Sequence, residues 1–247
     1  MSPTVVDISP YGDRVSCGLA GDLVIPRLVR REGRSVEVAL VAGRAMLMPG
    51  DDVRIQISVG EGCMLSLVDI GGLVVYGRTG EIGATSQWHA RVDLAERAHL
   101  SWGGLPTVIT DAGHLTRSLT VRLAPGSSAM LRETLVLGRA GEQGGRLRAD
   151  TDAADAVGPI LRESLEVSGR DPVPGVLGTE RVMDSILAFG ERVIVADVPG
   201  AARLDLERGG TVLRYLGEAL HESPLAGFTI AASRPAVVES QLQREHA

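Results

Sequence analysis

Apolar and polar residues alternate in several segments of this chain. The clearest is LTVRLAPGSSAMLRETLVLGRAGE, residues 119–142, in which the alternation runs up to a Pro-Gly corner and resumes beyond it. A period of two is typical of a β-strand that buries one face. The segment therefore predicts two strands joined by a tight corner.

Three segments share this strand-corner-strand pattern. They are ISVGEGCMLSL, VDLAERAHLSW and VRLAPGSSAML, residues 57–67, 92–102 and 121–131. In each, an even spacing across the corner keeps the apolar residues of both strands on one parity, as expected for strands that face a common core. The segments recur after 35 and 29 residues, which is too irregular for a propeller or a strict solenoid. We expect an all-β fold, either a layered β-helix-like stack or a sandwich, and the pattern does not separate arcs between layers from hairpins.

The chain changes character after residue 150. From Asp150 to Val176, acids, glycines and prolines surround a short apolar patch, which predicts an irregular crossing. Further on, TVLRYLGEALHE, residues 211–222, has apolar residues spaced for one helical face from Val212 to Leu220. This spacing predicts a small helical element near the C-terminus.

Two other segments of this part predict strands. They are ERVIVADV, residues 191–198, and AGFTIAASRP, residues 226–235. The tail from Val237 to Ala247 is polar and is expected to fray. A chain of 247 residues is long enough to bury one sizeable core, so we expect a single domain that spans residues 1–247.

Composition limits what this domain can bind. The aromatic residues are two Trp, three Tyr and two Phe, so stacking platforms for single-stranded nucleic acid are scarce. The formal net charge is -6, and the arginines are scattered instead of forming a basic stripe, which argues against DNA or RNA. No apolar run reaches the length of a membrane span. We expect neither a nucleic-acid partner nor a membrane partner.

The cysteines and the first residues indicate the compartment. Only Cys17 and Cys63 are present, too few for a disulfide-stapled secreted domain. The opening MSPTVVDISPYGDR has prolines and acids where a signal peptide has a charged start and an apolar run. We expect a cytoplasmic protein.

The residue types exclude several catalytic chemistries. All 25 basic residues are arginine, so neither a P-loop nor a Schiff-base lysine is present. Gly-x-Ser-x-Gly, His-Glu-x-x-His and a dinucleotide-binding Gly-x-Gly-x-x-Gly are also missing, and no catalytic acid and base stand out. Because lysine is the usual guard of exposed sheet edges, its absence predicts weak edge protection and poor behaviour of the isolated chain.

Cys63, His89 and His99 are the residues to consider as metal ligands. The five histidines never stand at the close spacing of a preassembled site. His89 and His99 share a strand parity across a corner and could face one way, although ordinary surface positions are favoured. Cys63 occupies a small-residue position of the repeated pattern, which favours a buried small side chain over a soft nickel ligand.

Glu133 breaks the alternation of its strand. If Leu131 and Leu135 face the core, Glu133 shares their parity, and an inward carboxylate is costly unless a partner or water satisfies it. One interpretation is that a bulge turns Glu133 outward as an ordinary surface acid. The other is that Glu133 lines a polar, water-filled interior through which a cation could move. Arg139 shares this parity and would reach Glu133 only if Gly138 bends the strand.

The region from about Asp51 to Glu142 resembles the urease accessory proteins of the UreD family, also called UreH. The features that recur in this order are Val75-Tyr76, Trp102 with Pro106-Thr107, Asp111, Glu133, Leu137-Gly138-Arg139 and Gly141-Glu142. Each feature is common by itself, but their ordered combination is specific. Family members usually carry a lysine before the tyrosine, where this chain has Leu73-Val74-Val75-Tyr76.

The resemblance implies an all-β, helix-like stack of strands with a small helical element. It also implies a non-enzymatic scaffold, or metallochaperone, for nickel insertion into apo-urease. In that role the chain bridges the urease apoprotein and two partners, an all-helical accessory protein (UreF-like) and a GTPase that carries nickel (UreG-like). Nickel would pass transiently, without a tightly bound cofactor.

The candidate site residues follow from the resemblance and the strand pattern together. Candidates for a polar passage or a partner face are Asp111, Glu133, Arg139 and Glu142, and a second set comprises Tyr76, Cys63, His89 and His99. The alternative function is a β-helical or sandwich enzyme that acts on carbohydrate through dispersed carboxylates. Such enzymes need two facing carboxyls and usually aromatic sugar platforms, which the few aromatic residues disfavour.

Overall fold

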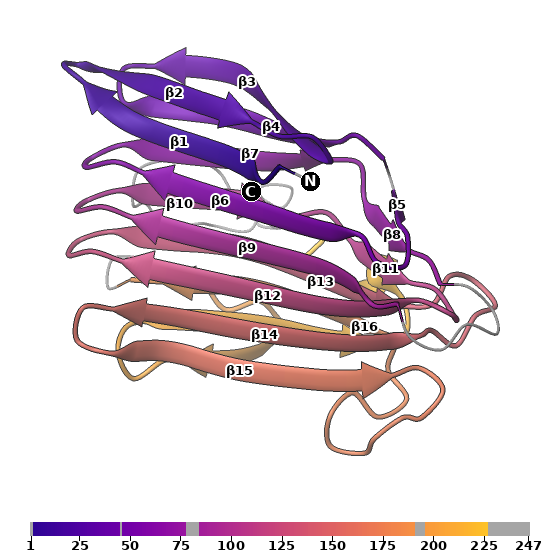
Figure 1. The fold of residues 1–247 in the computed structure, drawn as a ribbon. Coiled ribbons are helices and arrows are strands. Elements are labelled where there is room, and N and C mark those ends of the chain that lie inside the picture. Colours follow the sequence, from indigo (N-terminus) through magenta and orange to yellow (C-terminus); the bar gives the residue numbers. More distant parts are fainter. Residues whose placement is uncertain (1, 45, 78–83, 191–195, 227–247) are drawn as a thin grey trace, which may run out of the picture.

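The computed structural model describes residues 2–44, 46–77, 84–190 and 196–226. Within these residues two β-sheets face each other across an apolar core, and the chain winds between them in about four turns (Figure 1). The fold is therefore a β-solenoid, the layered form of the two expected all-β folds. The described residues contain essentially no helix beyond the single 3-10 turn η1 (Leu220–Glu222).

The two sheets differ in size within the described residues. The seven-stranded sheet has the order β15 (Pro159–Ser168), β14 (Arg146–Asp155), β12 (His114–Leu123), β9 (Ser86–Leu94), β6 (Asp52–Val59), β1 (Thr4–Tyr11) and β2 (Arg14–Ala20). The eleven-stranded sheet has the order β17 (Ala202–Asp205), β18 (Gly210–Gly217), β16 (Val182–Phe189), β13 (Ser128–Leu137), β10 (His99–Gly103), β7 (Met64–Ile70), β4 (Ser35–Ala42) and β3 (Val24–Glu32), with β5 (Met46–Leu47), β8 (Leu73–Val75) and β11 (Thr107–Ile109) beside it.

The three repeated segments are arcs and not hairpins. Each begins in the seven-stranded sheet, as β6, β9 or β12, and ends in the eleven-stranded sheet, as β7, β10 or β13. The fifth residue after the start of each segment has a positive φ: Gly62 at 63°, Arg97 at 55° and Gly126 at 71°. This left-handed position suits glycine and costs Arg97 some strain, so it is the local feature that turns the chain from one sheet into the other.

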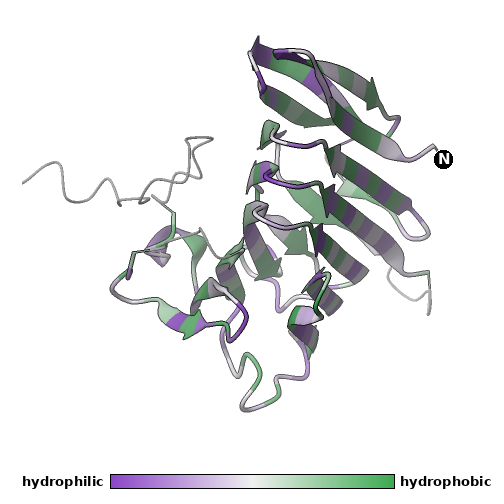
Figure 2. Ribbon diagram, turned by 90° about the vertical axis from the view of Figure 1, so that its left-hand side faces the viewer, coloured by the Kyte–Doolittle hydropathy of each residue, from purple (hydrophilic) through white to green (hydrophobic). Residues whose placement is uncertain are grey.

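Parallel pairing stacks equivalent residues of successive turns. Ile57, Val92 and Val121 are register partners across β6, β9 and β12, and all three are fully buried. Leu65 and Leu100 continue the same arrangement in the facing sheet. The expected alternation is visible along the strands as bands of hydrophobic and hydrophilic residues (Figure 2). The core is accordingly a stack of aliphatic layers.

The expected irregular crossing from Asp150 to Val176 is wrong over most of its length. β14 pairs with β12 in parallel over ten residues, and β15 pairs with β14. The buried residues of β14 include Ala149, Thr151 and Ala153, which are small and alternate with charged side chains. Because the inward positions of β14 hold mainly small residues, the sequence shows only a weak alternation of hydrophobic and polar residues there. Strands end at Ser168, and irregular chain follows to β16.

The expected helix from Val212 to Leu220 is also wrong, because residues 210–217 form β18. Val212 faces the main core, whereas Leu213 faces a second cluster on the outer side of the sheet, with Ile186 and Leu225. Both faces of the strand are buried, so consecutive apolar residues imitate helical spacing. The neighbouring strand β16, with all eight residues buried, was not predicted.

Other expectations for this part of the chain lie wholly or mainly outside the described residues. Of the expected strand at 191–198, only residues 196–198 are described, and they are not in a strand. Of the expected strand at 226–235, only Ala226 is described, in a turn, and the tail from 237 to 247 lies outside the described residues.

Ion pairs join the two sheets at the β15 end of the stack. Glu163 of β15 binds Arg214 of β18 through both carboxylate oxygens, at 2.5 and 2.8 Å. Asp155 binds Arg208 at 2.6 and 2.8 Å. The hydrogen bond from Arg214 holds the pKa of Glu163 below its ordinary value. A group whose pKa is lowered by folding stabilises the fold above its unfolded pKa, and that contribution is lost as the pH falls through the folded pKa.

We predict that Glu163→Gln lowers the free energy of unfolding by about 1–2 kcal/mol at neutral pH, because the half-buried Arg214 loses its countercharge. The difference from the wild type should shrink at an acidic pH, once the pH has fallen through the lowered pKa of Glu163 and the wild-type carboxyl is protonated as well. Urea denaturation at both pH values measures this, with the exposed Glu32→Gln as the matched control. A difference that stays constant with pH would contradict the assignment.

Candidate functional site

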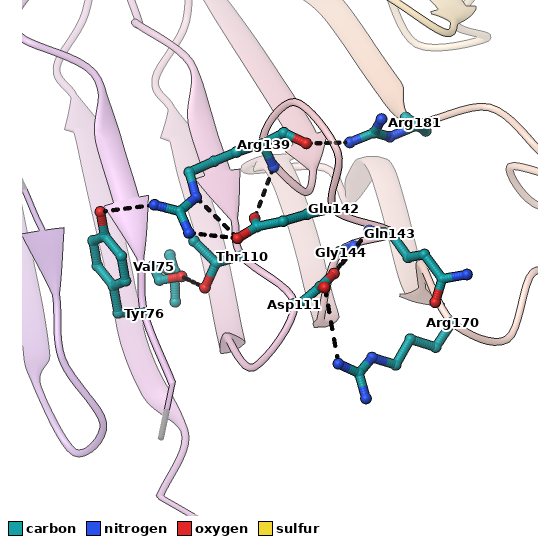
Figure 3. Close-up of polar contacts among 10 residues, drawn as sticks. All are labelled: Val75, Tyr76, Thr110, Asp111, Arg139, Glu142, Gln143, Gly144, Arg170 and Arg181. Carbon is teal, nitrogen blue, oxygen red and sulfur yellow. Dashed lines mark hydrogen bonds and ion pairs between the residues drawn. The ribbon is translucent and has the colours of Figure 1, made fainter. Parts of the chain in front are cut away.

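Four of the candidate residues gather at one end of the strands. Tyr76 follows β8, Asp111 follows β11, and Arg139 and Glu142 lie in the loop after β13 (Figure 3). We call these four residues the corner cluster. Glu133, the fifth candidate, lies elsewhere, inside the solenoid.

Arg139 is the centre of the corner cluster. Its guanidinium binds Glu142 Oε1 from Nε at 3.0 Å and from Nη2 at 2.5 Å, and its backbone N–H donates to Glu142 Oε2 at 2.9 Å. It also reaches Tyr76, with Nη1 3.5 Å from the phenol oxygen and Cζ 5.4 Å from the ring centroid. The hydrogen bonds between the two side chains raise the pKa of Arg139 and lower the pKa of Glu142. Both groups are therefore charged at physiological pH.

Backbone contacts hold this loop in one shape. Arg181 donates to the carbonyl oxygens of Leu137 and Arg139 at 2.9–3.0 Å. Gly138 has a φ of 75°, and a Cβ there would lie 2.8 Å from Arg181 Nη2 and from the Glu142 carbonyl oxygen. The Leu-Gly-Arg and Gly-Glu features of the sequence are thus the residues that build the loop.

Asp111 ties a second loop to the first. Its Oδ1 accepts hydrogen bonds from the backbone N–H groups of Gln143 and Gly144, both at 2.8 Å (Figure 3). Arg170 lies 3.9 Å from Oδ2. The corner cluster contains neither a nucleophile beside a base nor a set of metal ligands, so its chemistry is that of a rigid, charged surface suited to protein recognition.

Glu133 points into the core, so the interpretation as a surface acid on a bulge is wrong. The pairing of β13 with β16 is unbroken from Ala129 to Val136, and Glu133 is 7% exposed. Its partner is not Arg139 but Arg117 of the opposite sheet, with Nε 2.5 Å from Oε1. Arg117 also stacks on Trp88, with Cζ 3.6 Å from the ring centroid. The interior carboxylate is therefore neutralised across the core.

A small cavity of about 60 Å³ adjoins this interior pair, Arg117 and Glu133. Its lining also includes Asp69, Trp88 and Trp102. Asp69 accepts a hydrogen bond from Trp102 Nε1 at 2.9 Å, and burial raises the pKa of its carboxyl. The volume is sufficient for one or two water molecules. A cation that entered would have to compete with the Arg117 guanidinium for Glu133.

The remaining candidates, His89, His99 and Cys63, belong neither to the corner cluster nor to the interior pair. His89 and His99 share a parity but lie on the outer faces of opposite sheets, because the corner between them is an arc. They bind Ser118 and Ser128 at 2.6 and 2.7 Å. Cys63 is fully buried, as expected, and burial raises the pKa of its thiol. Among the described residues, no group of three or more His, Cys, Asp or Glu side chains is placed to hold a metal ion.

The sequence contained a signal for two interior residues that were not singled out. Arg117 shares the inward parity of Leu115 and Leu119, and Asp69 shares that of Leu67. A charged residue on an apolar parity is the same signal that identified Glu133.

Comparison with known proteins decides the family. The model of the UreD urease accessory protein family matches residues 21–244. This chain belongs to that family. Urease accessory protein UreD 1 of Streptomyces griseus is 39% identical over 198 residues, which are 79% of this chain and 76% of that protein. UreD of Frankia alni is 32% identical over 208 residues, 74% of this chain and 69% of that protein.

Membership of the UreD family assigns the chain to urease maturation, as a non-enzymatic accessory protein. A third relative, UreD 2 of Saccharopolyspora erythraea, is 29% identical over 88% of this chain and 74% of its own length. The alternative of a carbohydrate-acting enzyme is therefore wrong. Within the described part of the chain, no helix is long and apolar enough to cross a membrane.

We predict that Gly138→Ala destabilises this UreD protein by about 3 kcal/mol, because the new Cβ collides with Arg181 and the Glu142 carbonyl in a left-handed backbone. Gly141→Ala is the matched control, because Gly141 has a φ of 81° but no atom within 4 Å of the added Cβ. It should cost only about 1 kcal/mol. Urea unfolding of both variants measures the difference, and equal losses would show that the loop is not tightly packed.

Proposed function

We propose that this UreD protein is a scaffold for nickel insertion into apo-urease. It bridges the urease apoprotein and the complex of a helical accessory protein (UreF-like) with a nickel-carrying GTPase (UreG-like). The match to the UreD family along nearly the whole chain carries the proposal. The chain acts in the cytoplasm as a single domain of residues 1–247.

The shape of the molecule supports a scaffold role. A solenoid offers long surfaces whose side chains are fixed by the stacking of successive turns, which suits the binding of several proteins at once. The corner cluster adds a surface of paired charges that is held by Arg181, Asp111 and glycine turns. Binding of a partner protein at this surface requires no side chain whose pKa is adjusted for acid-base catalysis.

Nickel contacts the chain only in passing under this proposal. The described residues place no three metal-ligating side chains together, and chelation by several ligands is what gives a storage site its affinity. The nickel-carrying partner therefore supplies the affinity, and the scaffold supplies the geometry of delivery.

We predict that cells lacking only this gene accumulate urease protein without nickel and without activity, and that the chain restores both. Arg139→Ala should recover less of the accessory proteins on co-purification and should lower urease activation, because it removes the guanidinium that Tyr76 and Glu142 position. Arg91→Ala, an exposed arginine that is paired with Asp93 on β9 and lies outside the corner cluster, is the control. Full urease activity in the deletion strain would reject the scaffold function.

Glu133 permits a sharper test of how nickel moves. We propose that the interior carboxylate forms part of a polar route for the cation, supported by the cavity beside Glu133 and Asp69. The competing role is structural, in which Glu133 only neutralises Arg117. Replacing a buried ion pair by apolar residues is often tolerated, whereas removing one partner is not.

We predict that the double variant Arg117→Met/Glu133→Leu folds and binds partners but activates urease poorly, because it lacks the carboxylate. Glu133→Gln alone should be destabilised, because it leaves the buried Arg117 without its countercharge. Urea denaturation, co-purification and the nickel content of urease are the measurements. Normal activation by the folded double variant would reject the route through Glu133 and leave the ion pair as a structural element. That result would leave the scaffold function intact.

A further inference from the structure

The four outer edges of the two sheets are unequally protected within the described residues. These edges are β2 and β15 of one sheet and β3 and β17 of the other. An exposed edge presents unpaired N–H and C=O groups and can pair with another chain. β15 is the lowest strand in Figure 1, and it pairs only with β14.

Three of these edges are blunted. β3 has a bulge at Val29, where its register with β4 shifts between Leu28 and Arg30. β2 has its Val15 carbonyl oxygen occupied by the Arg31 side chain at 3.4 Å. β17 has only four residues. β15 has ten residues and an irregularity only at its start, so the regular edge from Leu161 to Ser168 is the longest one open to pairing.

The outward face of β15 carries an uneven distribution of charge. Arg162, whose side chain is 71% exposed, shares Asp152 with Arg122, which leaves a positive surplus there. Glu166 lies opposite Arg148, which is already paired with Asp150, and this leaves a negative surplus. Ser164 lies midway between the two.

This arrangement is self-complementary under a two-fold rotation. If two copies of β15 pair antiparallel about Ser164, each residue of one strand faces the residue of the second copy that lies equally far from Ser164 on the other side. Arg162 then faces Glu166 of the second copy, and Glu166 faces its Arg162. The inward residues Leu161 and Val167 also meet, which adds apolar contact at the edge. Directly opposed charges of opposite sign stabilise a pair of strands.

We propose that two copies of this chain associate through their β15 edges, with Ser164 at the two-fold axis. The occupant of the edge is a second copy, because pairing about Ser164 opposes Arg162 of each copy to Glu166 of the other. The contact is small, so the dimer is weak and depends on concentration. The sequence predicts weak protection of sheet edges and poor behaviour of the isolated chain. The β15 edge is the place in the fold where we expect such self-association to occur.

The test is sedimentation velocity on the full chain over a range of concentrations. The wild type should pass from monomer to dimer. Arg162→Glu and Glu166→Arg should each weaken dimerisation by roughly tenfold or more, because each variant opposes like charges at two positions. The double variant Arg162→Glu/Glu166→Arg should dimerise like the wild type. An equal mixture of the two single variants should form a heterodimer, because their edges are complementary.

The matched controls are Arg91→Glu and Asp93→Arg, which change the net charge equally on the same outer face but away from the edge. Circular dichroism confirms that each variant is folded. A wild type that stays monomeric, single variants that dimerise normally, or a double variant that does not recover would each overturn the proposal. So would variants that lose binding to the accessory proteins while the wild type alone remains monomeric, because the occupant would then be a partner.

Discussion

The parallel register between successive turns is the constraint on which the whole structure depends. Ile57, Val92 and Val121 lie side by side because the three arcs have the same length and a residue of left-handed backbone conformation at the same position. A shift of one residue in any strand would expose its apolar side chains and bury its charges. The ladder hydrogen bonds, the layered core and the positions of the loops therefore form together or not at all.

This register also explains where charges are tolerated. The inward carboxylates Glu133 and Glu163 have the uncharged register partners Ser185 and Thr151 in a neighbouring strand, so their countercharges come from the opposite sheet. Arg117 is the countercharge of Glu133, and Arg214 is that of Glu163. On the outer faces, pairs such as Arg91 and Asp93 lie along one strand and remain in contact with water. The interior pair of Arg117 with Glu133 thus joins the two sheets, whereas the outer pairs Arg91–Asp93 and Arg122–Asp152 lie within one sheet.

The strongly alternating part of the chain was predictable, and the weakly hydrophobic part was not. The strands around residues 57–131 carry large apolar residues, mainly Val, Leu and Ile, at most inward positions, whereas β14 buries mainly alanine and threonine. The sequence placed Glu133 on the inward parity, but its partner is in the facing sheet, which no spacing along the chain reveals. The proximity of Arg139 and Glu142 was predictable from the sequence, because the two residues are near neighbours in one loop. His89 and His99 were separated by an arc that parity alone cannot distinguish from a hairpin.

Trp88 and Trp102 are the only tryptophans of the chain, and their ring centroids lie 6.0 Å apart beside Arg117 and Asp69. One indole is stacked under a guanidinium, and the other donates its N–H to a carboxylate. Both contacts alter the excited state of an indole. The tryptophan fluorescence of this protein consequently originates beside the interior cavity, so the hydration and charge of that cavity can be followed optically without any label.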